Sequence, residues 1–110
     1  MNGIALGPDG NVWFTRSDSA VGRITPAGVA SRLALPTNVS EIATGPDGNL
    51  WVTSFGSTAG MIGRITPLGV ITTFMIPSGN VPNHIAAGPD GNLWFTELLG
   101  NKIGRIQIPR

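Results

Sequence analysis

The chain has 110 residues, of which 41% are apolar and only 12% are charged. This length suits one ordinary domain, and the apolar share argues against an intrinsically disordered chain. With 7 basic and 6 acidic residues, the net charge of +1 gives no electrostatic reason to expect nucleic acid or an anionic membrane as a partner. Because the chain has no cysteine, disulfides and thiolate metal sites are excluded.

The distribution of apolar residues disfavours two further classes of protein. No apolar stretch approaches the roughly 20 residues that a membrane-spanning helix needs. The start of the chain, "MNGIALGPDG", has neither the basic nor the hydrophobic region of a signal peptide. We therefore expect a soluble chain, and its sparse charge predicts that much of its surface is buried against other copies of itself.

The most prominent feature is a ten-residue cassette that occurs three times. It reads "GPDGNVWFTR" from residue 7, "GPDGNLWVTS" from residue 45 and "GPDGNLWFTE" from residue 88. A second motif follows each cassette, as "VGRITP", "IGRITP" and "IGRIQIP", and its arginines are spaced by 41 residues, at positions 23, 64 and 105. A fixed period of this length indicates a repeat architecture.

Within each repeat, the predicted elements follow in the same order along the chain. A short strand of small residues, such as "HIAA", leads into "GPDGN", whose residues suit a three-residue hairpin loop closed by a glycine at positive φ. "LWFT" and then "KIGRI" are β-rich strands, a "TPLG" turn follows, and "VITTFMI" forms the fourth strand. No window of 11 or more residues shows the apolar period of a helix.

Four short antiparallel strands in about 41 residues are typical of a β-propeller blade. We predict an all-β fold, a partial β-propeller of eleven strands in nearly three four-stranded antiparallel blades. The chain is then a single propeller segment, residues 1–110, with repeats at about 1–36, 37–77 and 78–110. Because an isolated blade covers neither of its apolar faces, we expect a homo-oligomer, a dimer or trimer, that closes a ring.

Residues that recur in every repeat are interpreted as structural. The tryptophans fit packing between blades rather than a ligand-stacking ladder, and the aspartates fit turns rather than metal ligation. The arginines fit contacts with an aspartate or a carbonyl of the same or an adjacent blade. These residues are Asp9, Asp47, Asp90, Trp13, Trp51, Trp94, Arg23, Arg64 and Arg105. Function is then expected where the repeats differ, as at the last cassette position, which is Arg16, Ser54 and Glu97 in turn.

The repeat, written as "PxxIAxGPDGNLWFTExxxNKIGRITPxGxI", closely resembles that of the virginiamycin B lyase (streptogramin lyase) family along essentially the whole chain. The strongest piece is "GPDGNLWFTE…NKIGRI" at residues 88–106. The resemblance implies a seven-bladed propeller and a carbon–oxygen lyase. This enzyme opens the lactone ring of type B streptogramin antibiotics by elimination, consumes no water and requires Mg²⁺.

Active blades of this family carry histidine in a "PHxI" motif, glutamate two residues before one such histidine, and another glutamate at the end of "LWFTE". This chain has Asn83 at the histidine position, where an amide cannot serve as a base, and Val81 in place of the first glutamate. Only Glu97 matches the family pattern. The corresponding positions of the second repeat also lack histidine; they are Asn38, Ser40 and Ser54.

Counting outward from the hairpin turn predicts that Asn83 lies opposite Glu97 and that His84 lies opposite Thr96, with Cβ atoms about 5 Å apart. His84 is the chain's only histidine, and a shift of one residue along a strand turns a side chain to the other face. We therefore interpret His84 as a packing or rim histidine, with a catalytic role as the alternative. Glu97 is either a rim carboxylate or a Mg²⁺ ligand, and Glu41, at the equivalent of His84, is interpreted as a rim residue.

Three functions remain open. The first is a non-catalytic scaffold or binding module that assembles into a closed ring. The second is a Mg²⁺-dependent lyase in which the chain is part of a larger or oligomeric propeller that takes a cyclic-peptide antibiotic. The third is a sensor or carbohydrate-binding propeller, because "PDGN" turns also occur in propellers of other functions. The missing histidine favours the first.

Overall fold

The computed structural model describes residues 3–16, 19–34, 38–55, 60–75, 82–97 and 102–107, which contain eleven strands in three antiparallel sheets. In each sheet the strands lie side by side in chain order. The first sheet consists of β1 (Ile4–Leu6), β2 (Val12–Arg16), β3 (Ala20–Ile24) and β4 (Ala30–Ala34). The second consists of β5 (Asn38–Thr44), β6 (Leu50–Phe55), β7 (Gly60–Ile65) and β8 (Ile71–Met75). The third consists of β9 (Pro82–Ala87), β10 (Leu93–Glu97) and β11 (Lys102–Ile106).

The prediction of an all-β fold with sheets of four, four and three antiparallel strands is confirmed. Each sheet lies within one of the three expected repeats. The described part of the chain contains no helix that could cross a membrane.

The cassette turns have the geometry that their sequence predicts. In the first, the amide of Gly7 donates to the carbonyl of Asn11 at 2.8 Å, and the amide of Gly10 donates to the carbonyl of Gly7 at 3.2 Å. Gly10 has a φ of 81°, a left-handed conformation that favours glycine. The equivalent glycines of the other two cassettes have a φ of 79°; they are Gly48 and Gly91.

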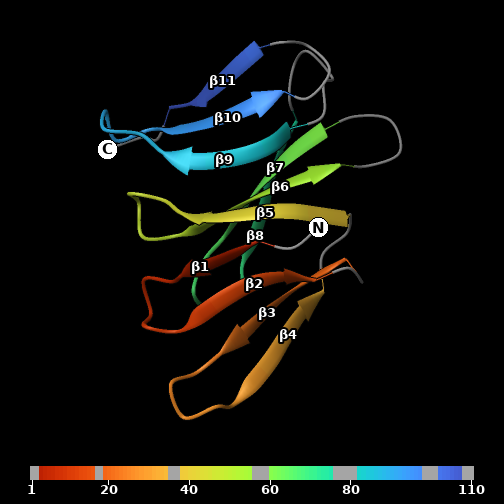
Figure 1. Cartoon of the computed structure of the whole chain (residues 1–110), viewed down its shortest axis with the longest axis vertical. Coiled ribbons are helices and arrows are strands. Elements are labelled where there is room, and N and C mark those ends of the chain that lie inside the picture. Colours follow the sequence, from red (N-terminus) through yellow and green to blue (C-terminus); the bar gives the residue numbers. More distant parts are fainter. Residues whose placement is uncertain are drawn as a thin grey trace.

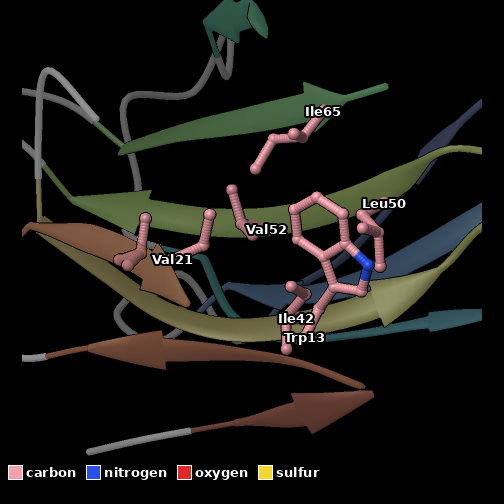
Figure 2. Packing of buried hydrophobic residues seen from close by; sticks show 7 residues of the cluster. Trp13, Val21, Ile42, Leu50, Val52 and Ile65 are labelled. Carbon is pink, nitrogen blue, oxygen red and sulfur yellow. The ribbon is translucent and has the colours of Figure 1, made fainter. Parts of the chain in front are cut away.

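The three sheets pack against one another in chain order, with β5 lying against both β1 and β9 (Figure 1). We call the side of a sheet that is turned toward the next sheet along the chain its forward face, and the opposite side its rear face. In the third sheet, the forward face is the side turned away from the second sheet. Trp13 and Trp51 lie on forward faces, and Trp94 has the same register in its sheet, so it lies on a forward face as well. Figure 2 shows Trp13 of the first sheet among Ile42, Leu50 and Val52 of the second.

Two apolar clusters therefore hold the three sheets together, one at each junction. At the first junction, Trp13 and Val21 pack with rear-face residues of the second sheet, among them Ile42 and Leu50. At the second junction, the residues are Trp51, Ile62, Ile85, Leu93 and Phe95. The core thus lies between the sheets, and each sheet depends on its neighbour for burial.

Candidate functional site

Each cassette aspartate is held by hydrogen bonds within its own hairpin. The indole Nε1 of Trp13 donates to Asp9 Oδ1 at 3.0 Å, and the amide Nδ2 of Asn11 donates to Asp9 Oδ2 at 2.8 Å. The indole bond recurs in the other two cassettes, from Trp51 to Asp47 and from Trp94 to Asp90. These carboxylates are therefore engaged in fixing the turn and the tryptophan.

The arginine of the following strand lies over the cassette tryptophan. Arg23 Cζ is 5.4 Å from the centre of the Trp13 ring, and Arg23 Nη1 is 3.8 Å from Asp9 Oδ2. The same guanidinium donates at 3.4 Å to the carbonyl of Pro67, in the turn that joins β7 to β8 of the second sheet. Equivalent cation–π contacts measure 5.9 Å for Arg64 on Trp51 and 5.5 Å for Arg105 on Trp94. An aspartate, a tryptophan and an arginine thus form one framework unit in each sheet.

Hydrogen bonding holds the pKa of the cassette aspartates below its ordinary value. Partial burial by itself raises the pKa of Asp47, but hydrogen bonds from the Trp51 indole and from the side chain and backbone of Asn49 outweigh it. The pKa of this carboxyl therefore lies below 3.8. The pKa of Asp9 is lowered in the same way against burial, and that of Asp90 chiefly by its Trp94 hydrogen bond.

These lowered pKa values predict a loss of stability in acid. A carboxylate with a depressed pKa contributes its full stabilisation above the unfolded-state pKa and loses it as the pH falls through the folded-state pKa. We expect the free energy of unfolding to be level above about pH 5 and to fall below about pH 4, as measured by urea unfolding across pH. Asp47→Asn should make this acid slope shallower, and an unchanged slope would contradict the assignment.

A β-bulge interrupts the pairing of the first two strands in the second and third sheets. In the third sheet, Phe95 pairs with Ile85 but Glu97 pairs with Pro82, so that Asn83 and His84 share the space opposite Thr96. The predicted pairing of Asn83 with Glu97 is therefore wrong by one residue. Counting from the turn assumes an unbroken ladder, whereas a bulge inserts one extra residue on one strand.

A threonine hydroxyl bonds the backbone at each bulge, a role that the sequence reasoning missed. The amide of Glu41 donates to Thr53 Oγ1 at 3.0 Å, and that of His84 donates to Thr96 Oγ1 at 3.2 Å. In the first sheet, Thr15 Oγ1 accepts the equivalent bond from the amide of Gly3. The same hydroxyl donates to the carbonyl of Ser40 in the second sheet at 3.1 Å. The only sequence signal is that threonine recurs as the ninth letter of every cassette.

Three equivalent positions line up from sheet to sheet beside these threonines. They are Gly3, Glu41 and His84. The Nδ1 atom of His84 is 4.0 Å from Glu41 Oε1, and the side chains of His84 and Glu41 are 62% and 22% exposed. A Cβ on Gly3 would lie 3.2 Å from Glu41 Oε1. His84 thus faces a carboxylate of the neighbouring sheet and forms an ion pair with it only when protonated.

The residues at the ends of the second strands are only partly described by the structure. The backbone of Glu97 pairs with Lys102, and its side chain and that of Asn83 lie outside the described residues. Ser54, at the equivalent of Glu97, is 5% exposed. Within the described ranges, no three His, Asp or Glu side chains come together as a metal-binding group.

A pocket of about 180 Å³ lies at the first junction, between β4 and the turn that joins β7 to β8. Its walls include Trp13, Arg23, Leu33, Pro67 and Leu68. At the second junction, Phe74 occupies the position of Leu33 and stacks on the tryptophan there at 5.7 Å. The pocket thus forms where Leu33 is smaller than the equivalent phenylalanine. It lies beside the ring of Trp13 and the guanidinium group of Arg23.

Comparison with known proteins places these sheets in a family. The sequence pattern of the Virginiamycin B lyase family matches residues 1–109. Selenomethionine-substituted virginiamycin B lyase from Staphylococcus aureus is 44% identical to this chain, with a TM-score of 0.87. A streptogramin B lyase is 38% identical with a TM-score of 0.86. A catalytically inactive histidine-to-alanine variant of the Staphylococcus aureus lyase with quinupristin is 40% identical, also with a TM-score of 0.86.

Each of these three matches covers 94% of this chain and 36% of the other, so the chain spans about a third of the length of these relatives. A protein of unknown function from Bacteroides caccae, 19% identical with a TM-score of 0.68, covers 94% of this chain and 40% of that one and supports the fold alone. A comparison with curated proteins gave no match. The chain belongs to the virginiamycin B lyase family, and its three sheets are blades of a β-propeller.

Proposed function

We propose that this chain is a non-catalytic scaffold segment of the lyase-type propeller, and that it assembles into a closed ring with further copies of itself. The observation that carries the proposal is Asn83 at the histidine position of the family motif. An amide side chain is not basic enough to abstract a proton from carbon. The inactive histidine-to-alanine variant of the Staphylococcus aureus lyase supports the view that such proteins depend on a histidine.

The setting of His84 supports the same reading. Its backbone amide is bound by Thr96, and its ring faces Glu41 of the preceding blade at 4.0 Å. In this single copy 62% of the side chain is exposed, so the described residues by themselves do not enclose the ring. A general base works best in hydrogen-bond reach of a bound substrate from which water is excluded.

The scaffold reading also accounts for what each blade retains. The aspartate, tryptophan and arginine framework recurs in every repeat, together with the bulge threonine. These groups position strands and fill blade junctions, and none of them needs a ligand. Each blade thus has the residues that hold its strands and junctions together, whereas Asn83 stands where the family motif has a histidine that could act as a base.

The second candidate function is that of a Mg²⁺-dependent lyase acting on type B streptogramins. It is favoured by the 44% identity to virginiamycin B lyase, and Glu97 matches the glutamate of the family cassette. Because the chain covers 36% of that relative, the catalytic base would have to come from another part of a larger or oligomeric propeller.

Incubation of the purified chain with virginiamycin B and Mg²⁺ separates the two candidates. Elimination opens the lactone without changing the mass of the antibiotic, whereas hydrolysis adds one water, so chromatography with mass detection identifies either product. We expect no ring opening above the protein-free control, with the Staphylococcus aureus lyase as the positive control. Ring opening that is abolished in Glu97→Gln would overturn the scaffold proposal in favour of the lyase.

A further inference from the structure

The forward face of the third blade is open, although its residues match those that are buried elsewhere. The cassette tryptophans of the first two blades are 3% and 2% exposed, whereas Trp94 is 37% exposed. On the third strand of each blade, the difference in exposure is larger. Val21 and Ile62 are each 1% exposed, whereas Ile103 is 70% exposed. The third blade thus presents an apolar surface of the kind that the other two blades bury against a neighbour.

The rear face of the first blade shows the complementary pattern. Ile42 and Ile85, on the rear faces of the second and third blades, are 5% and 9% exposed. Their equivalent in the first blade, Ile4, is 73% exposed, and Leu6 on the same face is 70% exposed. This surface is therefore built like the two rear faces that receive a tryptophan-bearing forward face.

Both internal junctions join a forward face to a rear face. The forward face supplies an indole and a branched aliphatic side chain, and the rear face supplies isoleucine and leucine. The hydroxyl of Thr15 also crosses the first junction to the carbonyl of Ser40 at 3.1 Å, and Thr96 stands at the equivalent position on the open face. The surface that fits the Trp94 face is thus a rear face.

The three aligned positions beside the bulge threonines, Gly3, Glu41 and His84, indicate the same pairing. Gly3 stands at the place in the first blade where Glu41 stands in the second and His84 in the third. In a forward-to-rear junction, His84 of one copy would lie beside Gly3 of the next, which has no side chain of its own. The net charge of +1 adds little repulsion between copies.

We infer that the open forward face of the third blade docks on the open rear face of the first blade in a second copy of this chain, repeating the geometry of the two internal junctions. The inference rests on the proposed scaffold function, because it specifies how copies would complete the ring. Such head-to-tail contacts either close into a ring or continue as a filament. Two copies give about six blades and three copies about eight or nine, against the four to eight of most propellers.

Variants that block one face at a time test the inference by complementation. Ile4→Lys/Leu6→Lys blocks the rear face of the first blade, and Ile103→Lys blocks the forward face of the third. All three side chains are at least 70% exposed in the single copy, so folding should be retained, as checked by circular dichroism. Leu68→Lys is the matched control, because this side chain is 94% exposed in a turn outside both faces.

Sedimentation velocity then measures the mass of each sample. We expect the unmodified chain and Leu68→Lys to associate, each face-blocked variant alone to sediment as an 11.4 kDa single copy, and their mixture to form a one-to-one dimer. Association of either blocked variant alone to the unmodified extent would show that like faces pair, and would overturn the inference. A mixture that stays monomeric, or an unmodified chain that is a monomer, would overturn it as well. A monomeric unmodified chain would also contradict the ring assembly in the proposed function, whereas streptogramin ring opening tests its non-catalytic part separately.

Discussion

Replacing Trp51 with alanine is expected to lower the free energy of unfolding by about 3–5 kcal/mol, the usual cost of truncating a fully buried aromatic side chain. Trp51 is 2% exposed and packs against Ile85 and Phe95 of the third blade. It also stacks on Phe74 at 5.7 Å and donates its indole N–H to Asp47 at 3.0 Å. The substitution therefore opens a cavity at a blade junction and removes a hydrogen bond from the adjoining turn.

Trp94→Ala is the matched control, because Trp94 occupies the same cassette position and is 37% exposed. In dilute protein it should cost less, about 1–2 kcal/mol, since less apolar surface is lost from the folded state. Urea unfolding followed by far-ultraviolet circular dichroism measures both variants without relying on tryptophan fluorescence. Equal losses for the two would contradict the assignment of Trp51 to a filled junction and of Trp94 to an open one.

Gly104→Ala is expected to destabilise the chain by about 1–3 kcal/mol through overpacking. A Cβ at this position would lie 2.2 Å from Cζ of Phe95, which is directly opposite on β10. Phe95 is 7% exposed within the second junction, so its ring has no free space to enter. The clash must therefore be relieved by moving the junction itself.

Gly22→Ala offers the matched comparison in the first blade. Its Cβ would also lie 2.2 Å from a phenylalanine Cζ, that of Phe14, but Phe14 is half-buried on a rear face that no blade covers in this structure. In protein dilute enough to be a single copy, Phe14 can swing outward, so we expect a smaller loss in thermal and urea unfolding. A loss as large as that of Gly104→Ala in the dilute single copy would contradict the assignment of Phe14 to an open face. Phe95→Leu combined with Gly104→Ala should recover part of the lost stability.

The fold is predictable from the sequence because its signals are local and repeated. The glycine at positive φ and the alternating strands lie within one repeat, and the constant spacing of Arg23, Arg64 and Arg105 shows that the repeat recurs. The three sheets and their strand order follow from these signals. The aspartate and tryptophan of each cassette are four residues apart, so their hydrogen bond is a local feature as well.

The arrangement at the candidate site depends on features that no short stretch of sequence carries. The bulge changes the backbone partner of Glu97 from the expected Asn83 to Pro82, and the segment "PNHIA" contains no glycine that would signal it. The approach of His84 to Glu41 joins residues of different blades, and only the packing of the sheets brings them together. The exposure of Trp94 could not be inferred from a cassette that is nearly identical in all three repeats, because exposure depends on the neighbouring blade.

The mass of the unmodified chain in solution tests most directly whether its two open faces bind one another. Sedimentation velocity or native mass spectrometry at micromolar concentration is predicted to give a species at a multiple of 11.4 kDa, a dimer or a trimer. Circular dichroism on the same sample establishes that the strands are folded. A well-folded 11.4 kDa monomer that persists as the concentration is raised would contradict this prediction.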